Sequence, residues 1–133
     1  MKIYLAGPMR GYPSFNRVAF ADWAGILRRK GHEVFSPAEH SVKLFGEAVR
    51  DNANGDEGRM GGDQMTISRT VFSLDMQWIC LHADAVALLP GWENSKGATA
   101  EAACGRAVPI LVKPVEEFVG NPDKLMRSAD AKS

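Results

Sequence analysis

Hydrophobic residues follow two patterns that alternate along the chain. Strands are predicted over residues 2–6, 32–35, 83–89 and 108–112, which contain short apolar runs such as Ala85 to Leu89, typical of strands buried on both faces. Apolar residues spaced by three or four positions, typical of amphipathic helices, cover residues 14–30, 38–50 and 66–81. A further predicted helix, rich in small residues, follows the turn Pro90-Gly91 and ends at Arg106.

This order of elements predicts an α/β fold. Strands that alternate with helices form a parallel sheet covered on both faces, here a Rossmann-like or flavodoxin-like three-layer sandwich of four to five strands. The length of 133 residues suits a single domain over 1–133. Residues 51–64 hold four glycines and few apolar side chains, which predicts a flexible insert, either a mobile lid or a disordered segment. Residues 120–133 form a polar tail that is expected to fray.

Two of the helical patterns indicate which side chains face the sheet. The expected stripe of the first helix is Phe15, Ala19, Trp23, Ile26 and Leu27. The expected stripe of the helix over 66–81 is Ile67, Val71, Leu74, Trp78 and Leu81. Asp75 lies beside this second stripe, so it is expected either at the edge of the sheet or as a plain surface carboxylate.

Charge and cysteine content exclude several classes of function. Sixteen Lys plus Arg balance sixteen Asp plus Glu, so no overall field favours a nucleic acid polymer or an anionic membrane. No apolar run reaches the length of a membrane span. Cys80 and Cys104 fall in predicted helices without metal-ligand spacing, and they are expected to be buried, reduced thiols in a cytoplasmic protein. His32 and His40 are expected to be ordinary surface histidines.

Candidate chemistry follows two of the strands. Gly7, Arg10 and Gly11 lie in the loop after the first strand, where glycines let the backbone fold around an anion and the guanidinium can bind it. Ser95 and Gly97 lie at a thinly covered helix start, where free backbone N–H groups favour an anion. The carboxyl ends of parallel strands share one edge of the sheet, so both loops are expected to form one ligand site there.

Glu101, in the helix that begins after Ser95, has two interpretations. It can project toward a ligand bound at the helix start, or it can be an acidic residue favoured by the helix macrodipole, an effect of about 0.3–1 kcal/mol. The residues alone leave both open.

Four separated motifs resemble the nucleoside 2-deoxyribosyltransferase superfamily, in particular its nucleoside 5′-monophosphate N-glycosidase-like branch and related small phage-associated proteins of unassigned function. The motifs are Ile3-Tyr4-Leu5-Ala6-Gly7 with Arg10-Gly11, Asp75-Met76-Gln77-Trp78, Ala83-Asp84-Ala85-Val86, and Ser95-Lys96-Gly97-Ala98-Thr99-Ala100-Glu101 with Gly105-Arg106-Ala107. The last motif is the most specific, because its serine stands six residues and its glycine four residues before the glutamate.

The resemblance implies catalytic roles for three residues. Glu101 would be the nucleophile that attacks C1′ of a (deoxy)ribosyl unit, and Tyr4 would hold its carboxylate in line. Asp75 would act as the acid or base that handles the proton of the leaving base and of the acceptor. The implied reaction cleaves or exchanges the N-glycosidic bond of a (deoxy)nucleoside 5′-monophosphate and needs no metal or cofactor.

The resemblance also implies where the substrate binds. Arg10, Ser95 and the backbone of Gly97 match phosphate-binding positions, while Pro8 stands where the monophosphate branch has a serine. Trp92 is expected either to stack on the base or to fill the gap beneath its turn. The expected partner is a small-molecule nucleotide, and the assembly is expected to be a homodimer or a larger homo-oligomer.

Two other functions remain open from the sequence. The missing serine at position 8, and an Asp75–Asp84 spacing one residue longer than the family pattern, favour a non-catalytic nucleotide-binding or sensing module. An NAD glycohydrolase is the other alternative, because attack at C1′ is chemically the same reaction.

Overall fold

The computed structural model describes residues 1–40 and 64–120, with side chains from residue 69 onward in the second range. Its strands are β1 (Lys2–Ala6), β2 (Glu33–Phe35), β3 (Ala85–Leu88) and β4 (Leu111–Pro114). Its helices are α1 (Arg17–Arg29), α4 (Gln64–Leu81) and α5 (Lys96–Ala107), with short 3-10 helices at Pro13–Asn16, Trp92–Asn94 and Val115–Phe118. The predicted α/β class is confirmed.

The sheet is parallel throughout, with strand order β2-β1-β3-β4. The chain moves from β1 to β2 on one side and then crosses to β3 on the other side of β1. The strand order therefore reverses between β1 and β3, and open α/β sheets bind ligands at such a point, outside the carboxyl ends of the strands. The arrangement agrees with the predicted Rossmann-like three-layer sandwich.

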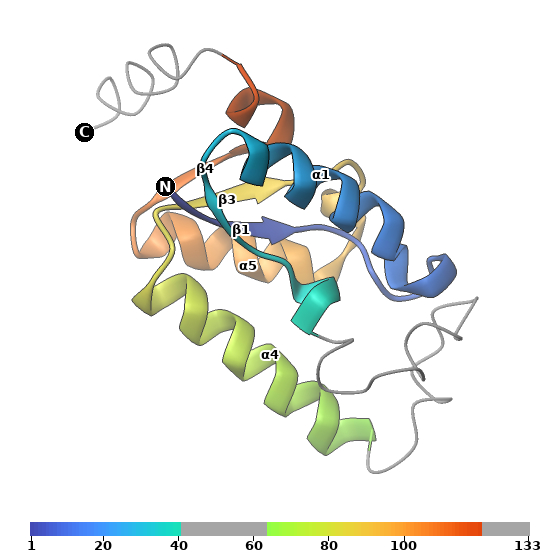
Figure 1. Cartoon of the computed structure of the whole chain (residues 1–133). Coiled ribbons are helices and arrows are strands. Elements are labelled where there is room, and N and C mark those ends of the chain that lie inside the picture. Colours follow the sequence, from blue (N-terminus) through green and yellow to red (C-terminus); the bar gives the residue numbers. More distant parts are fainter. Residues whose placement is uncertain (41–63, 121–133) are drawn as a thin grey trace.

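Alternate residues of β1 serve the two faces of the sheet. Ile3 and Leu5 join the core beneath α1, which also includes Phe20 and Leu27. The other face is covered by α4 and α5 (Figure 1). Its core consists of Tyr4, Ala6, Ile79, Val86, Leu88, Ala98 and Ala102. The side chain of Tyr4, including its hydroxyl group, is thereby buried on the face that α4 and α5 cover.

The first helix begins later than predicted. Ser14, Phe15 and Asn16 have positive φ angles of 49°, 57° and 62°, so the chain makes a separate turn before α1 starts at Arg17. The helix consequently buries Phe20, Ala24 and Leu27, while Ala19 and Trp23 of the expected stripe are only partly buried. Phe15 is buried, but from the preceding 3-10 helix.

The expected stripe of α4 is correct only in part: Trp78 packs against the core on this face of the sheet, but a neighbouring row of the helix is the most deeply buried. Asp75 and Ile79 are buried, whereas Leu74 and Leu81 are 39% and 70% exposed. Val71 and Trp78 are partly buried. Asp75 and Ile79 are four residues apart and so share one helix face. The expected edge or surface position of Asp75 is therefore corrected to the centre of the inward face.

Two strand boundaries and the cysteine environment also differ from expectation. β3 is limited to Ala85–Leu88, and β4 begins at Leu111 because α5 continues to Ala107 and the amide of Ile110 still bonds to the carbonyl of Gly105. Cys80 is exposed, and Cys104, which packs against the core on this face of the sheet, is only partly buried. The expectation that both thiols are buried is wrong.

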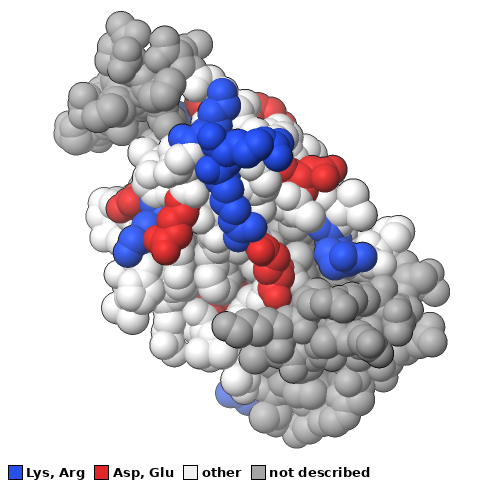
Figure 2. All heavy atoms as spheres, in the orientation of Figure 1, with Lys and Arg blue, Asp and Glu red and all other residues white. Residues whose placement is uncertain are grey.

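Charged side chains on the α1 face are mixed in sign. Figure 2 shows Lys and Arg side chains gathered over this face with Asp and Glu side chains beside them. Arg28 pairs with Glu39 across 2.6 Å, and Lys2 approaches Glu33 to 3.9 Å. Within the part of the chain that the structure describes, no helix is long and apolar enough to cross a membrane.

Three predicted segments fall largely outside the described residues. The helix predicted over 38–50 is described only up to residue 40, where residues 37–40 are helical. The glycine-rich insert at 51–64 is described only at Gln64, the first residue of α4. The tail at 120–133 is described only at Gly120.

Close approach of α5 to the sheet depends on Gly105. A Cβ at this position would lie 2.8 Å from Val112 Cγ2 and 2.9 Å from Val86 Cγ2. We expect Gly105→Ala to lower the free energy of unfolding by about 1–3 kcal/mol in urea denaturation, because the helix must move away from β3 and β4. Gly97→Ala in the same helix is the matched control: of the described atoms, its Cβ would meet only Ser95 Oγ, at 4.0 Å, so stability should stay constant or rise by up to about 1 kcal/mol. Equal losses in both variants would contradict the packing argument.

Candidate active site

Tyr4 carries the hydroxyl around which the site is built. It lies in β1, is fully buried, and donates a hydrogen bond from its hydroxyl to Oε2 of Glu101. These residues are 97 positions apart in the chain and meet because α5 covers the same sheet face to which Tyr4 points. Tyr4 and Glu101, both predicted site residues, are brought together.

Glu101 is buried because α5 packs its small residues on the sheet. Ser95 caps the helix by accepting a hydrogen bond at Oγ from the amide of Ala98, and Ala98 and Ala102 then lie in the core on either side of Glu101. Glu101 is only 6% exposed and stands beyond the first helical turn, which holds no acidic residue. Because the macrodipole acts within the first turn, it does not account for this carboxylate.

Asp75 provides a second buried carboxylate, from α4. It is 5% exposed, and its Oδ1 lies 3.1 Å from Nδ1 of His40. His40 follows β2, and its side chain is 18% exposed. The expectation that His40 is an ordinary surface histidine is wrong, because the inward turn of α4 brings Asp75 against it.

Aromatic rings hold these polar groups in place. The ring of Phe35, at the end of β2, stacks on Tyr4 with centroids 5.4 Å apart and on Trp78 with centroids 5.0 Å apart. The ring of His40 meets Phe35 edge-on at 5.3 Å. Phe35 therefore contacts Tyr4, the partner of Glu101, and His40, the partner of Asp75. Stacked or edge-on pairs of this kind restrict rotation of the Tyr4 and His40 rings.

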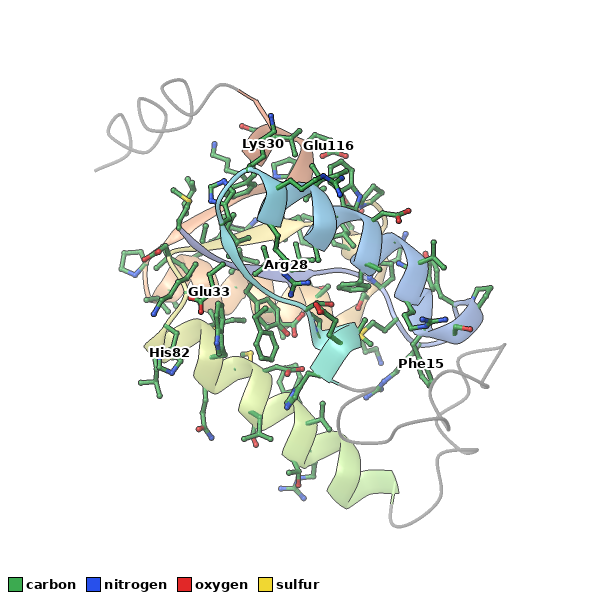
Figure 3. All side chains as sticks on the ribbon, viewed as in Figure 1. Phe15, Arg28, Lys30, Glu33, His82 and Glu116 are labelled. Atoms are coloured by element: carbon green, nitrogen blue, oxygen red, sulfur yellow. The ribbon has the colours of Figure 1, made fainter. Side chains whose placement is uncertain are left out.

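Arg28 fixes the turn that carries His40. It reaches down from α1 past the sheet (Figure 3) and donates to the carbonyl of Val34 at 3.0 Å. It also donates to both carboxylate oxygens of Glu39, at 3.0 and 2.6 Å. A two-pronged contact between guanidinium and carboxylate has a defined geometry, so the residue next to His40 is tied to α1.

The buried position raises the pKa of both carboxyl groups. Burial raises the pKa of Glu101 from its ordinary 4.5 to about 8; the hydrogen bond from Tyr4 lowers it and the charge of Asp75 raises it. Burial likewise raises the pKa of Asp75, opposed by the hydrogen bond and charge of His40 and by a hydrogen bond with Tyr4. Burial, then the charges of Glu101 and Asp75, raise the pKa of Tyr4 well above 10, so its hydroxyl stays a donor.

The loops after β1 and β3 touch each other at the carboxyl edge of the sheet. A Cβ at Gly91 would lie 3.2 Å from the hydroxyl of Tyr12 and 3.3 Å from Pro8 Cγ. Asn16 braces the first loop by donating from Nδ2 to the carbonyl of Pro8 at 3.0 Å. The two loops predicted to share a ligand site are therefore neighbours.

Glycine is favoured at positions 7 and 11 of these loops for different structural reasons. A Cβ at Gly7 would lie 2.8 Å from Leu89 Cβ, so Gly7 is required by the packing of β1 on the turn after β3. Gly11 has a φ of +79°, which favours glycine. Among the described residues, no atom lies within 4 Å of a Cβ added at Gly11, and a Cβ at Gly97 would approach Ser95 Oγ to 4.0 Å.

Arg10 and Trp92 lie in the loops that follow β1 and β3. Arg10 is exposed in the loop after β1. Trp92 is partly buried against the core beneath α5, and the guanidinium of Arg106 lies 5.9 Å from the centre of its ring. The contacts of Trp92 are those of a side chain that fills the gap beneath its turn, one of its two expected roles.

Two residues of the site were missed by sequence reasoning. His40 and Phe35 lie on a short strand and the turn after it, and they show no spacing relative to Asp75 or Tyr4 along the chain. The available signal was weak: one histidine and one aromatic residue close to the carboxyl end of a predicted strand. Among the residues that the structure describes, no three His, Cys, Asp or Glu side chains gather as a metal site.

The raised pKa of Glu101 makes a prediction about stability. Between pH 4.5 and about 8 the folded protein holds a proton on Glu101 that the unfolded chain has lost, so stability falls as the pH rises through this window. The side chain of Glu101→Gln stays neutral at every pH. Between pH 5 and pH 8 its free energy of unfolding, measured in urea, should therefore fall by about 2–4 kcal/mol less than that of the parent protein.

Tyr4→Phe provides the complementary change for the same measurement. It removes the hydrogen bond that lowers the pKa of Glu101, so the loss of stability should extend to higher pH than in the parent. Parallel stability curves for the parent and Glu101→Gln would show that Glu101 does not carry the shifted proton.

Comparison with known proteins places the chain in a family without assigning an activity. No curated protein and no solved structure matches it. Residues 1–113 match a family model described as a domain of unknown function, DUF4406. This match spans β1 to β4 and includes Tyr4, His40, Asp75 and Glu101. The chain belongs to the DUF4406 family.

Proposed function

We propose that this protein cleaves or exchanges the N-glycosidic bond of a (deoxy)nucleoside 5′-monophosphate. The observation that carries the proposal is the pair of buried carboxyl groups, Glu101 held by Tyr4 and Asp75 held by His40, on one face of the sheet. Retaining glycoside chemistry uses one carboxylate to attack the anomeric carbon and a second group to move protons. The resemblance to the nucleoside 2-deoxyribosyltransferase superfamily supports the same assignment.

In the proposed reaction Glu101 attacks C1′ and Asp75 protonates the leaving base. Glu101 must lose its proton before the attack, and its pKa of about 8 makes activity rise with pH up to that value. Asp75 then accepts a proton from water or from a second base, which attacks C1′ of the glycosyl ester and releases Glu101. His40, 3.1 Å from Asp75, orients this carboxyl group and favours its ionised form once the proton has passed to the leaving base.

The 5′-phosphate is proposed to bind between the two loops at the carboxyl edge. Arg10 supplies a permanently charged, planar donor. Ser95 accepts the bond from Ala98 and still has its hydroxyl hydrogen to donate, and Gly97 adds a backbone N–H beside open space. An anion is favoured at this start of α5. The proposal includes the homo-oligomeric assembly and the cytoplasmic location expected from the sequence.

The reaction is tested by looking for free base. The protein is incubated with nucleosides, nucleoside monophosphates and NAD, with and without an acceptor base, and products are separated by chromatography. We expect base release from a deoxynucleoside monophosphate and no turnover by Glu101→Gln, whose amide cannot form the glycosyl ester. Tyr4→Phe should release base about 10–100-fold more slowly than the parent, because it lacks the hydrogen bond to the charged carboxylate.

The control for this assay is Glu116→Gln, the same substitution at an exposed residue of the 3-10 helix after β4. It should keep the parent rate. Release of base by Glu101→Gln at a rate near the parent would exclude the nucleophile assignment. Binding of monophosphates without any product would favour the non-catalytic module, and release of nicotinamide alone would favour the NAD glycohydrolase.

Phosphate recognition is tested at Arg10. Arg10→Ala should weaken monophosphate binding by about 2–4 kcal/mol and leave binding of the parent nucleoside nearly constant, measured by calorimetry. Arg29→Ala removes the same charge from the opposite end of α1 and should change neither affinity. Equal losses for nucleotide and nucleoside in Arg10→Ala would exclude the phosphate site and favour a nucleoside transferase.

A further inference from the structure

Two cysteines far apart in the chain meet between α4 and α5. Cys80 is in the last turn of α4 and Cys104 is in the second half of α5, and their Sγ atoms are 3.6 Å apart. A disulfide has an S–S length of about 2.05 Å, so the sulfur atoms need to approach by only about 1.5 Å to bond. This distance is within reach of small side-chain rotations at the ends of two packed helices.

The two thiols differ in their surroundings. Cys80 is exposed, so a dissolved reagent can reach its sulfur. Cys104 is partly buried; burial, its contact with Cys80 and the charge of Glu101 raise the pKa of its thiol to about 11. The thiolate is the form that attacks disulfides, so Cys80 is the sulfur suited to react first and Cys104 the one suited to react second.

We propose that Cys80 and Cys104 form a thiol–disulfide exchange site that takes small disulfides of the glutathione class and closes into a disulfide between α4 and α5. The Cys80 thiolate attacks one sulfur of glutathione disulfide, and glutathione thiolate leaves and takes up a proton. Cys104 then loses its proton and attacks Cys80 Sγ, which releases the second glutathione. The protein dithiol is oxidised by two electrons and glutathione disulfide is reduced to two thiols.

The disulfide would join the two helices that carry the buried carboxyl groups. Cys80 follows Asp75 by five residues on α4, and Cys104 follows Glu101 by three residues on α5. At 3.6 residues per turn, each sulfur is within about one and a half turns of a carboxyl group. The link would therefore restrict the relative movement of Asp75 and Glu101, whatever reaction they perform. The site itself does not rest on the proposed function, because its chemistry is read from the thiols.

The test uses the full-length protein, reduced, freed of reductant and incubated with glutathione disulfide. We expect loss of both thiols, a monomer lighter by about 2 Da and no retained glutathione. Trypsin cuts after Arg69, Lys96 and Arg106, so Cys80 lies in the peptide 70–96 and Cys104 in the peptide 97–106. These two peptides should be joined after oxidation and separate after treatment with dithiothreitol.

Two single variants establish the order of the steps. Cys104→Ser should stop at a stable mixed disulfide between Cys80 and glutathione, because the second thiol is gone. Cys80→Ser should react at least tenfold more slowly, because the remaining thiol is partly buried and its pKa is raised. A lasting glutathione adduct on the parent protein, a disulfide-linked dimer, or faster reaction of Cys80→Ser than of Cys104→Ser would overturn the proposal.

Discussion

Burial of the Glu101 carboxyl group beside the hydroxyl of Tyr4 is the constraint on which the architecture of this protein depends. A carboxyl group removed from water costs several kcal/mol unless a partner satisfies it. Tyr4 supplies that partner from the middle of β1, where the strand is covered on both faces. The pair can form only if α5 lies close to the sheet, and the small residues Ala98, Ala102 and Gly105 allow this approach. The small residues of α5 thus allow the close packing that brings Glu101 to the Tyr4 hydroxyl.

The second carboxyl group explains the unusual orientation of α4. Turning Asp75 inward leaves Leu74 and Leu81 exposed, which forfeits apolar burial worth about 1.5–3 kcal/mol for each fully buried leucine. The same orientation allows Asp75 to bond with His40 and the ring of Trp78 to stack on Phe35. The exchange places two buried carboxyl groups with raised pKa values on one face of the sheet, and this arrangement supports the proposed site there.

Strand order and thiol chemistry connect this face to its surroundings. Because the order reverses between β1 and β3, the loops after these strands meet above the carboxyl edge, which is where the 5′-phosphate is proposed to bind. Cys80 and Cys104 lie further along the helices that carry Asp75 and Glu101. The proposed disulfide would therefore act on the relative position of the two carboxyl groups.

Much of the fold was determined by the sequence, because it rests on local patterns. The continuous apolar runs of β1 and β3, the small-residue helix α5 and the order of elements predicted the parallel sheet. The family resemblance, carried by separate short motifs, singled out Tyr4 and Glu101. These signals depend on neighbours within a strand or a helical turn. A hydrophobic period reports the possible inward faces of a helix, and the most apolar face is the usual choice.

Only the tertiary structure decided which face of α4 points inward, because that choice depends on partners contributed by distant segments. His40 and Phe35 are more than thirty residues from Asp75, and nothing in their spacing reveals that they meet it or its neighbours. The same holds for the two cysteines, whose sulfur atoms approach because α4 and α5 pack side by side. Two element boundaries also differ from the sequence prediction. The left-handed residues before α1 delay its start to Arg17, and α5 continues to Ala107. Turns and helix ends respond to packing as well as to propensity.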